Sequence, residues 1–178
     1  MLHTFGHGTL DAESFAALLL DAGVELVADV RAFPGSRRHP HVGRDALAEW
    51  LPERGISYRW LPALGGRRRP VPDSDHVALR NTSFRAYADH METEEFARGV
   101  AELLALTADA RTTVLCSESV WWRCHRRLLA DHLALVRGVD VVHLMHDGRL
   151  TPHAPTDGVR RDGDRLVYDA GAAPTLFG

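Results

Sequence analysis

Two cysteines and a histidine stand close together in the chain, and these are the side chains best able to do chemistry. Seven residues, SESVWWR, separate Cys116 from Cys124, and His125 follows directly. The thiolate is the reactive form of cysteine, and nearby arginines, a protonated histidine or a helix N-terminus lower the pKa of a thiol. Arg123 and Arg126 bring two positive charges within ten residues of Cys116. The spacing therefore favours a lowered pKa and a nucleophilic role for Cys116.

The same residues have alternative interpretations. A cysteine at the end of a buried strand is often a small core residue, and a histidine on a buried helix face is often held by structural hydrogen bonds. Cys116, Cys124, His125 and His7 could instead hold a metal, although their spacing matches no standard zinc pattern. A redox pair of the two cysteines is not favoured in a reducing compartment. Glu118 opposes a thiolate unless it acts as the base, so Cys116, Glu118 and His125 are the catalytic candidates.

A strand, a cysteine, a loop and an arginine before a helix are also the order found in cysteine phosphatases and rhodaneses. Their loops surround an oxyanion with backbone amides, which needs a tight turn. Six residues separate Cys116 from Arg123 here, one more than those loops use, and they include two tryptophans and no glycine. We therefore do not expect such a cradle.

The basic residues are all arginines, and they are unevenly distributed. The chain of 178 residues has 21 basic residues and a formal net charge of -3, which excludes a general polyanion binder. A GC-rich genome would account for the absence of lysine. The arginines nevertheless cluster along the chain, at Arg37 and Arg38, at Arg67 to Arg69, and at Arg123, Arg126 and Arg127.

Apolar segments that suit strands alternate with segments that suit helices. Strands are expected near residues 3–7, 24–30, 56–61, 112–116 and 139–145, and helices near 11–22, 44–54, 82–91, 93–106 and 123–136. This order predicts one three-layer α/β domain over residues 1–150, with a mostly parallel sheet of about five strands and helices on both faces. Residues 151–178 are expected to form a C-terminal extension packed on the domain or trailing from it, with a hairpin at Asp162-Gly163.

Most of the chemically able side chains follow a predicted strand. The carboxyl ends of parallel strands meet at one edge of a sheet, and ligands bind there. Asp29 and Arg31 point to the same side of their strand, where they could pair with each other or hold an anion. The glycine pair before Arg67 permits a close-approaching loop. The predicted substrate-binding residues are His7, Asp29, Arg31, Arg37, Gly66, Arg67, Arg123 and Arg126.

Five segments closely resemble a bacterial family known as domain of unknown function 488: FGHGT, LVADVRAFPGSRR, GISYRWLPALGGRRRP, SFRAYADHM and VLCSESVWWRCHRRLLADHL. The resemblance runs from about His3 to His153. The family usually has serine in place of Gly8, so any role of that hydroxyl in relatives does not carry over to this chain. The resemblance implies membership of the family and brings no reaction with it.

These observations predict an enzyme that acts on an anionic substrate, for which a nucleotide-like molecule is one option, at a pocket of cysteine, histidine and arginine at the carboxyl edge of the sheet. One alternative is a non-catalytic module that binds a nucleotide or nucleic acid, with the arginines on phosphate and Trp121 and Trp122 stacking on bases. A second alternative is a metal-binding domain. The sequence identifies no cofactor.

The chain is expected to be cytoplasmic. No apolar run approaches the roughly 20 residues that span a bilayer, and residues 1–8 have neither the basic region nor the apolar core of a signal peptide.

Overall fold

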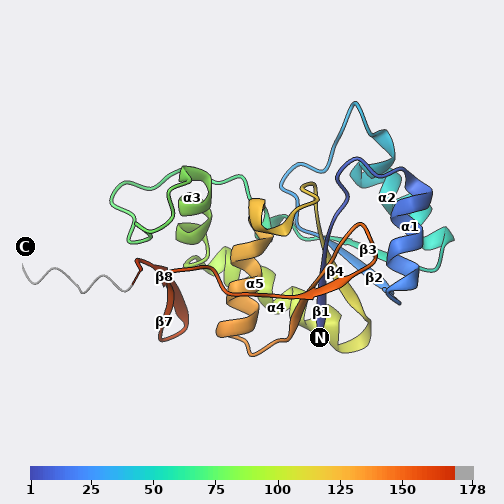
Figure 1. Ribbon diagram of the computed structural model, residues 1–178. Helices are drawn as coiled ribbons and strands as arrows, with labels where there is room; N and C mark the ends of the chain where they lie inside the picture. The colour runs from blue at the N-terminus through green and yellow to red at the C-terminus, as the bar shows by residue number, and fades with distance from the viewer. Residues whose placement is uncertain (171–178) are drawn as a thin grey trace, which may run out of the picture.

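A six-stranded sheet lies between two layers of helices in the computed structural model, which describes residues 1–170 (Figure 1). The strand order is β3-β2-β4-β1-β5-β6, and β6 is antiparallel to β5 while the other neighbours are parallel. The strands are β1 (Leu2–Gly6), β2 (Leu26–Asp29), β3 (Ser57–Trp60), β4 (Thr112–Cys116), β5 (Val141–Leu144) and β6 (Leu150–Pro152). The predicted α/β fold with a mostly parallel sheet is confirmed.

Five α-helices cover the sheet, and side chains cap several of them. They are α1 (Ala12–Asp21), α2 (Arg44–Glu53), α3 (Thr82–His90), α4 (Glu94–Asp109) and α5 (Arg126–Leu135). The Asp11 carboxylate accepts a hydrogen bond from the Ser14 backbone N–H at the start of α1, and the Thr93 hydroxyl caps α4 in the same way. Short 3-10 turns lie at Pro40–Val42, Pro62–Leu64 and Trp121–Arg123.

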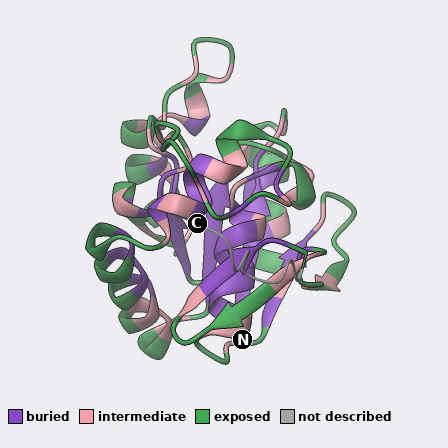
Figure 2. Ribbon diagram, turned by 90° about the vertical axis from the view of Figure 1, so that its left-hand side faces the viewer, coloured by how far each residue is buried: buried purple, intermediate pink, exposed green. Residues whose placement is uncertain are grey.

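Each face of the sheet carries its own apolar core. Phe15 and Leu19 of α1 and Leu47 of α2 pack against one face, and residues of α4 and α5 such as Val100 and Leu129 pack against the other. Buried residues accordingly run through the strands and the inner sides of the helices (Figure 2). The periodic apolar residues of the helices thus position them on both faces, as the sequence predicts.

The C-terminal segment after β5 contacts the rest of the fold. Its strand β6 extends the sheet, and β7 (Val159–Asp162) and β8 (Arg165–Tyr168) form a separate hairpin. Gly163 adopts φ 63° at the turn, close to the predicted hairpin position. Tyr168 is fully buried, and its hydroxyl donates a hydrogen bond of 3.0 Å to Asp131 in α5. The rest of the predicted extension, residues 171–178, lies outside the described residues.

One helix begins later than the sequence predicts. The segment expected to be helical from Arg123 is a 3-10 turn through Arg123, followed by Cys124 in an extended conformation (φ -126°, ψ 151°). The α-helix therefore begins at Arg126, and His125 lies at its N-cap position. Helical periodicity alone did not reveal this break, which directs the Cys124 side chain away from the helix.

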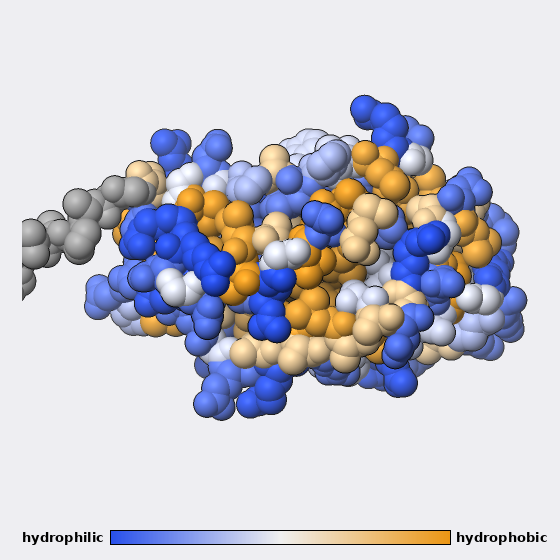
Figure 3. Space-filling view, turned by 90° about the horizontal axis from the view of Figure 1, so that it is seen from below, coloured by the Kyte–Doolittle hydropathy of each residue, from blue (hydrophilic) through white to orange (hydrophobic). Residues whose placement is uncertain are grey.

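The outer surface of the molecule is mixed in character. Seen from below Figure 1, hydrophobic and hydrophilic residues are interspersed, and strongly hydrophilic side chains stand around the rim (Figure 3). Within the described residues, no helix combines the length and the apolar character needed to cross a bilayer.

The connections that follow β1 and β4 leave the sheet on opposite faces. The chain leaves β1 through α1 towards β2 on one face, and it leaves β4 through α5 towards β5 on the other face. The loops that follow β2, β3 and β4 enclose a crevice beyond the carboxyl ends of these strands, at the edge where open α/β sheets bind ligands. Gly6 at the end of β1 lies in register with Cys116 at the end of β4.

Candidate functional site

The crevice holds a compact cluster of two thiols and one imidazole. The Sγ atoms of Cys116 and Cys124 are 2.8 Å apart. The Nδ1 atom of His125 lies 3.7 Å from the Cys116 sulfur and 3.6 Å from the Cys124 sulfur. Both cysteines are buried and free of disulfide bonds. A β-carbon on Gly66 would overlap the His125 ring, so the glycine loop packs directly against this cluster.

Local backbone geometry brings the two sulfurs together. Cys116 ends β4, and the loop after it continues beside β1, where the backbone N–H of His7 donates to the Cys116 carbonyl at 3.1 Å. A β-carbon on Gly6 would overlap the backbone carbonyl of Glu118, so this close approach requires glycine. The 3-10 turn then reverses the chain, and the extended Cys124 directs its sulfur back towards Cys116.

The two thiols have opposite acidities. The pKa of the Cys116 thiol is held well below its usual range, chiefly by the hydrogen bond that the Cys124 thiol donates. His125 and Arg126 act in the same direction, while burial opposes them. Burial, with the same hydrogen bond, raises the pKa of Cys124 well above its usual range. The pair therefore favours a thiolate on Cys116 and a proton on Cys124.

Arg126 lies beneath the loop that follows β4. Its side chain is only 2% exposed, and its Nη2 atom donates hydrogen bonds of 2.6 Å and 2.9 Å to the carbonyls of Glu118 and Ser119. It does not line the cleft described next. The guanidinium thus holds the loop and adds positive charge near Cys116, without facing a ligand directly.

A cleft of about 370 Å³ opens above the cluster. Its volume falls in the range of small-molecule sites. It is lined by Arg31, Ala32, Phe33, Gly66, Arg67, Ser83, Phe84, Cys116, Ser117, Glu118, Arg123, Cys124 and His125. Arg67 and Arg123 are exposed, and neither makes an ion pair with any residue that the structure describes. The cleft therefore combines a thiol floor with a positive rim.

A buried network supports one side of the cleft. Arg31 pairs with Asp29 through contacts of 2.8 Å and 2.5 Å, and Tyr58 donates a 2.7 Å hydrogen bond to the same carboxylate. Arg31 also reaches His7 Nε2 at 3.2 Å. Burial, assisted by the Arg31 charge, lowers the pKa of His7 to about 4, so its ring is neutral near neutral pH. Asp29 and Arg31 thus pair with each other, which is one of the two arrangements that their spacing predicts.

Five more of the candidate ligand-binding residues lie outside the cleft, namely His7, Asp29, Arg37, Trp121 and Trp122. Arg37 is exposed on the loop after β2 and does not line the cleft. Trp121 stacks on His143, with ring centroids 4.0 Å apart and an angle of 8° between the planes. Trp122 is 46% exposed and lies edge-on to Trp121. One face of Trp121 is therefore already occupied within the fold, which leaves less ring surface for the stacking of bases.

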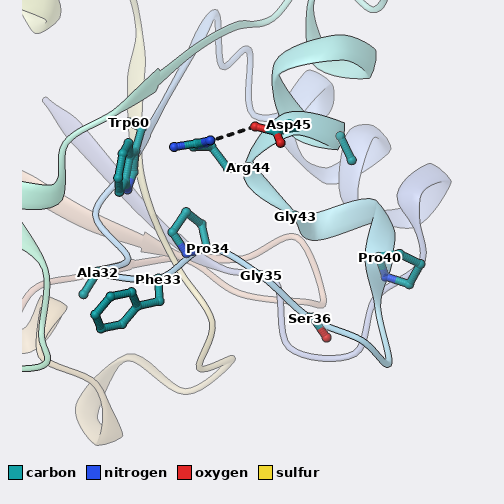
Figure 4. A pocket seen from close by; sticks show the side chains of 11 residues that line it. Ala32, Phe33, Pro34, Gly35, Ser36, Pro40, Gly43, Arg44, Asp45 and Trp60 are labelled. Atoms are coloured by element: carbon teal, nitrogen blue, oxygen red, sulfur yellow. Dashed lines mark hydrogen bonds and ion pairs between the residues drawn. The ribbon is translucent and has the colours of Figure 1, made fainter.

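A second hollow adjoins the cleft, and sequence reasoning missed it. It has a volume of about 650 Å³ and shares Ala32 and Phe33 with the cleft. Trp60 and Arg44 face each other across its upper side in Figure 4, and the Arg44 guanidinium carbon lies 4.9 Å from the Trp60 ring centroid. The sequence held two signs of this hollow, namely an aromatic residue at the end of a predicted strand, Trp60, and the apolar segment Ala32-Phe33-Pro34 after another strand. The two hollows together extend the crevice along the carboxyl edge.

Comparison with known proteins identifies a family for this chain. No curated protein and no solved structure matches the chain. The family model for the domain of unknown function DUF488 matches residues 11–133. That match includes β2, β3, β4 and both cysteines. Because it covers more than half of the sequence, the chain belongs to the DUF488 family.

Proposed function

We propose that this protein is an enzyme that acts on a small anionic molecule, such as a phosphorylated metabolite or nucleotide, with Cys116 as the nucleophile. The observation that carries the proposal is the Cys116 sulfur at the floor of the cleft, 2.8 Å from the Cys124 thiol that donates to it. A thiolate that is stabilised in this way reacts at neutral pH, where an ordinary thiol is largely protonated.

The other side chains of the cleft have separate roles in this proposal. Arg67 and Arg123 bind the anionic group, because guanidinium groups pair well with phosphate and carboxylate oxygens. Glu118 lines the cleft and is exposed, so it can exchange protons with the substrate. His125, with Nδ1 3.7 Å from the Cys116 sulfur, supports the thiolate. Attack by Cys116 would form a bond from its sulfur to the electrophilic atom of the substrate while the bond from that atom to the leaving group breaks, and the leaving group would take a proton from solvent.

Alkylation kinetics test both parts of the proposal. Iodoacetate is anionic and iodoacetamide is neutral, so the ratio of their rate constants at Cys116 reports the charge of the cleft. We expect this ratio to fall in Arg67→Gln and Arg123→Gln, whereas Arg37→Gln, which removes the same charge outside the cleft, should leave it unchanged. Inorganic phosphate or a nucleoside monophosphate should also slow alkylation in a saturable way.

Two results would contradict the proposal. One is an alkylation rate at Cys116 no higher than that of a free thiol at neutral pH. The other is equal sensitivity of the ratio to Arg37→Gln and to the two rim substitutions. A turnover screen against phosphorylated compounds, with Cys116→Ser as the inactive reference, then identifies the substrate.

Metal binding is a second candidate function, and one observation favours it. The ligand atoms of Cys116, Cys124 and His125 all lie within 4.8 Å of one another. Tetrahedral zinc with its usual bond lengths separates sulfur from nitrogen by about 3.6 Å, close to the distances of 3.7 Å and 3.6 Å here. Stoichiometric zinc in the purified protein, lost in Cys124→Ser, would favour this candidate.

Two features weigh against a metal. The sulfurs of a tetrahedral zinc site are about 3.8 Å apart, whereas these are 2.8 Å apart. A metal-bound histidine also usually donates its second ring N–H to a partner, and the Nε2 atom of His125 is buried with no hydrogen-bond partner among the described residues. The thiolate enzyme is therefore the better supported function.

A further inference from the structure

We infer that Cys116 and Cys124 form a reversible intramolecular disulfide when the protein meets a hydroperoxide. This inference rests on the proposed function, because it uses the same nucleophilic thiolate and assigns a second chemistry to it. The sequence alone did not favour such a pair, because disulfides are rare in reducing compartments, but those that form there are usually transient and catalytic or redox-sensing.

The distance between the sulfurs is the first argument. A disulfide has an S–S bond of about 2.05 Å, and the two Sγ atoms already lie 2.8 Å apart. They need to approach by less than 1 Å. Cys124 belongs to the short connection between the 3-10 turn and α5, so it is not held within a helix or strand of the sheet.

Access to the cleft is the second argument. Both cysteines line the open cleft, so a small hydroperoxide can reach the Cys116 sulfur even though the residue as a whole is buried. The rim arginines stand at the mouth of the same cleft.

The two thiols also suit the two steps of the reaction. The Cys116 thiolate attacks the distal oxygen of the hydroperoxide and breaks the O–O bond, which gives a sulfenic acid and an alcohol or water after the leaving oxygen takes a proton. The Cys124 sulfur then attacks the sulfenyl sulfur, forming the S–S bond and releasing hydroxide. The thiol proton of Cys124 converts that hydroxide to water, and His125 Nδ1, 3.6 Å from the Cys124 sulfur, can carry it. The two cysteines together lose two electrons, and the hydroperoxide gains them.

Formation of this disulfide would switch the proposed enzyme off. The Cys116 sulfur that acts as nucleophile would be bonded to Cys124 and unable to attack a substrate. An external dithiol would restore it by thiol–disulfide exchange, first attacking one sulfur and then releasing both as thiols. The proposed enzyme would therefore work only while the pair is reduced.

The test is a peroxide titration of the full chain. Hydrogen peroxide is added in equimolar amount, and free thiols, intact mass and oligomeric state are measured before and after dithiothreitol. Metal content is measured on the same sample. We expect the two free thiols to disappear together, a mass loss of two hydrogens in a monomer, and complete recovery with dithiothreitol.

Two variants locate the steps. Cys124→Ser should stop at the Cys116 sulfenic acid, which a dimedone label detects, and Cys116→Ser should react with peroxide much more slowly. A native protein that goes directly to sulfinic acid, forms an intermolecular disulfide, or keeps both thiols after treatment would overturn the inference.

Alkylation of the same preparations separates this inference from the proposed function. Fast alkylation of Cys116 without disulfide formation would leave the nucleophile in place and refute the dithiol chemistry. Slow alkylation of Cys116, with a disulfide formed by the thiol oxidant diamide but not by hydrogen peroxide, would refute both the nucleophile and the peroxide reaction.

Discussion

Removal of the Cys124 thiol should change how fast Cys116 reacts, and the change should reverse sign with pH. In Cys124→Ala the Cys116 thiolate loses the hydrogen bond that most lowers its pKa. A hydrogen bond to an ionised group contributes about 1.5–3 kcal/mol, and a thiol is a weak donor, so we take the lower limit. About 1.4 kcal/mol corresponds to a tenfold change in an equilibrium constant. The thiolate fraction at a pH below the pKa should therefore fall about tenfold.

The remaining thiolate of the variant is more basic, and that partly offsets the loss. With a Brønsted coefficient of about 0.4–0.5, a tenfold weaker acid gives a thiolate that is about threefold more nucleophilic. Iodoacetamide should consequently alkylate the variant about threefold more slowly at low pH and about threefold faster at a pH where Cys116 is ionised in both proteins. The two rate profiles should cross.

Stopped samples taken across the pH range, with the extent of Cys116 alkylation measured by mass spectrometry, provide the assay. Cys124→Ser is the matched control, because its hydroxyl can still donate to the Cys116 sulfur, and it should follow the native profile more closely. Thermal unfolding of each variant confirms that it is folded. Profiles of Cys124→Ala and native protein that coincide at every pH would refute the assignment of Cys124 as the donor.

Three further predictions concern stability. Gly6→Ala should lower the melting temperature measured by calorimetry, because the new methyl group would overlap a backbone carbonyl of the loop after β4. Overpacking of this kind costs about 1–3 kcal/mol of stability. Gly35→Ala is the control and should have little effect, because no atom lies within 4 Å of the added carbon. Tyr58→Phe should cost about 1–3 kcal/mol in urea denaturation, since the buried Asp29 carboxylate loses a donor. Burial lowers the pKa of His132 from 6.5 to about 4. Between these pH values the unfolded chain binds more protons than the folded chain, so the free energy of unfolding should fall as the pH falls. His132→Leu should make this decline less steep, and an unchanged dependence of stability on pH would contradict the lowered pKa of His132.

Alternating strand and helix patterns allowed most of the fold to be predicted. The short run of strand residues in VELVADV predicted a strand, the apolar stripes of the helices indicated the sides that pack on the sheet, and a parallel sheet brings His7, Asp29 and Cys116 to one edge. The short sixth strand β6 was not predicted, because Leu150–Pro152 has three residues and ends in proline.

The paths of the loops explain what could not be predicted. The sequence left open whether Asp29 and Arg31 pair, and the buried geometry selects pairing. No local pattern distinguishes Arg37, which lies outside the cleft, from Arg67, which lines it, because both stand in loops rich in proline and glycine. A loop's direction depends on long-range packing, such as the close approach at Gly66.

The burial of Arg126 is easiest to understand together with Cys116. A guanidinium that is 2% exposed loses most of its hydration, and such a charge is costly unless it is paired. Two backbone carbonyls accept hydrogen bonds from one of its nitrogens, while Nε and Nη1 have no hydrogen-bond partner, and no carboxylate pairs with the side chain, among the described residues. Burial lowers the pKa of Arg126, and the nearby cysteines Cys124 and Cys116 oppose that shift, while Arg126 in turn helps to lower the pKa of Cys116. The buried Arg126 guanidinium and the lowered pKa of the Cys116 thiol therefore depend partly on each other. A neutral side chain at position 126 should therefore raise the pKa of Cys116, but by less than the loss of the Cys124 donor.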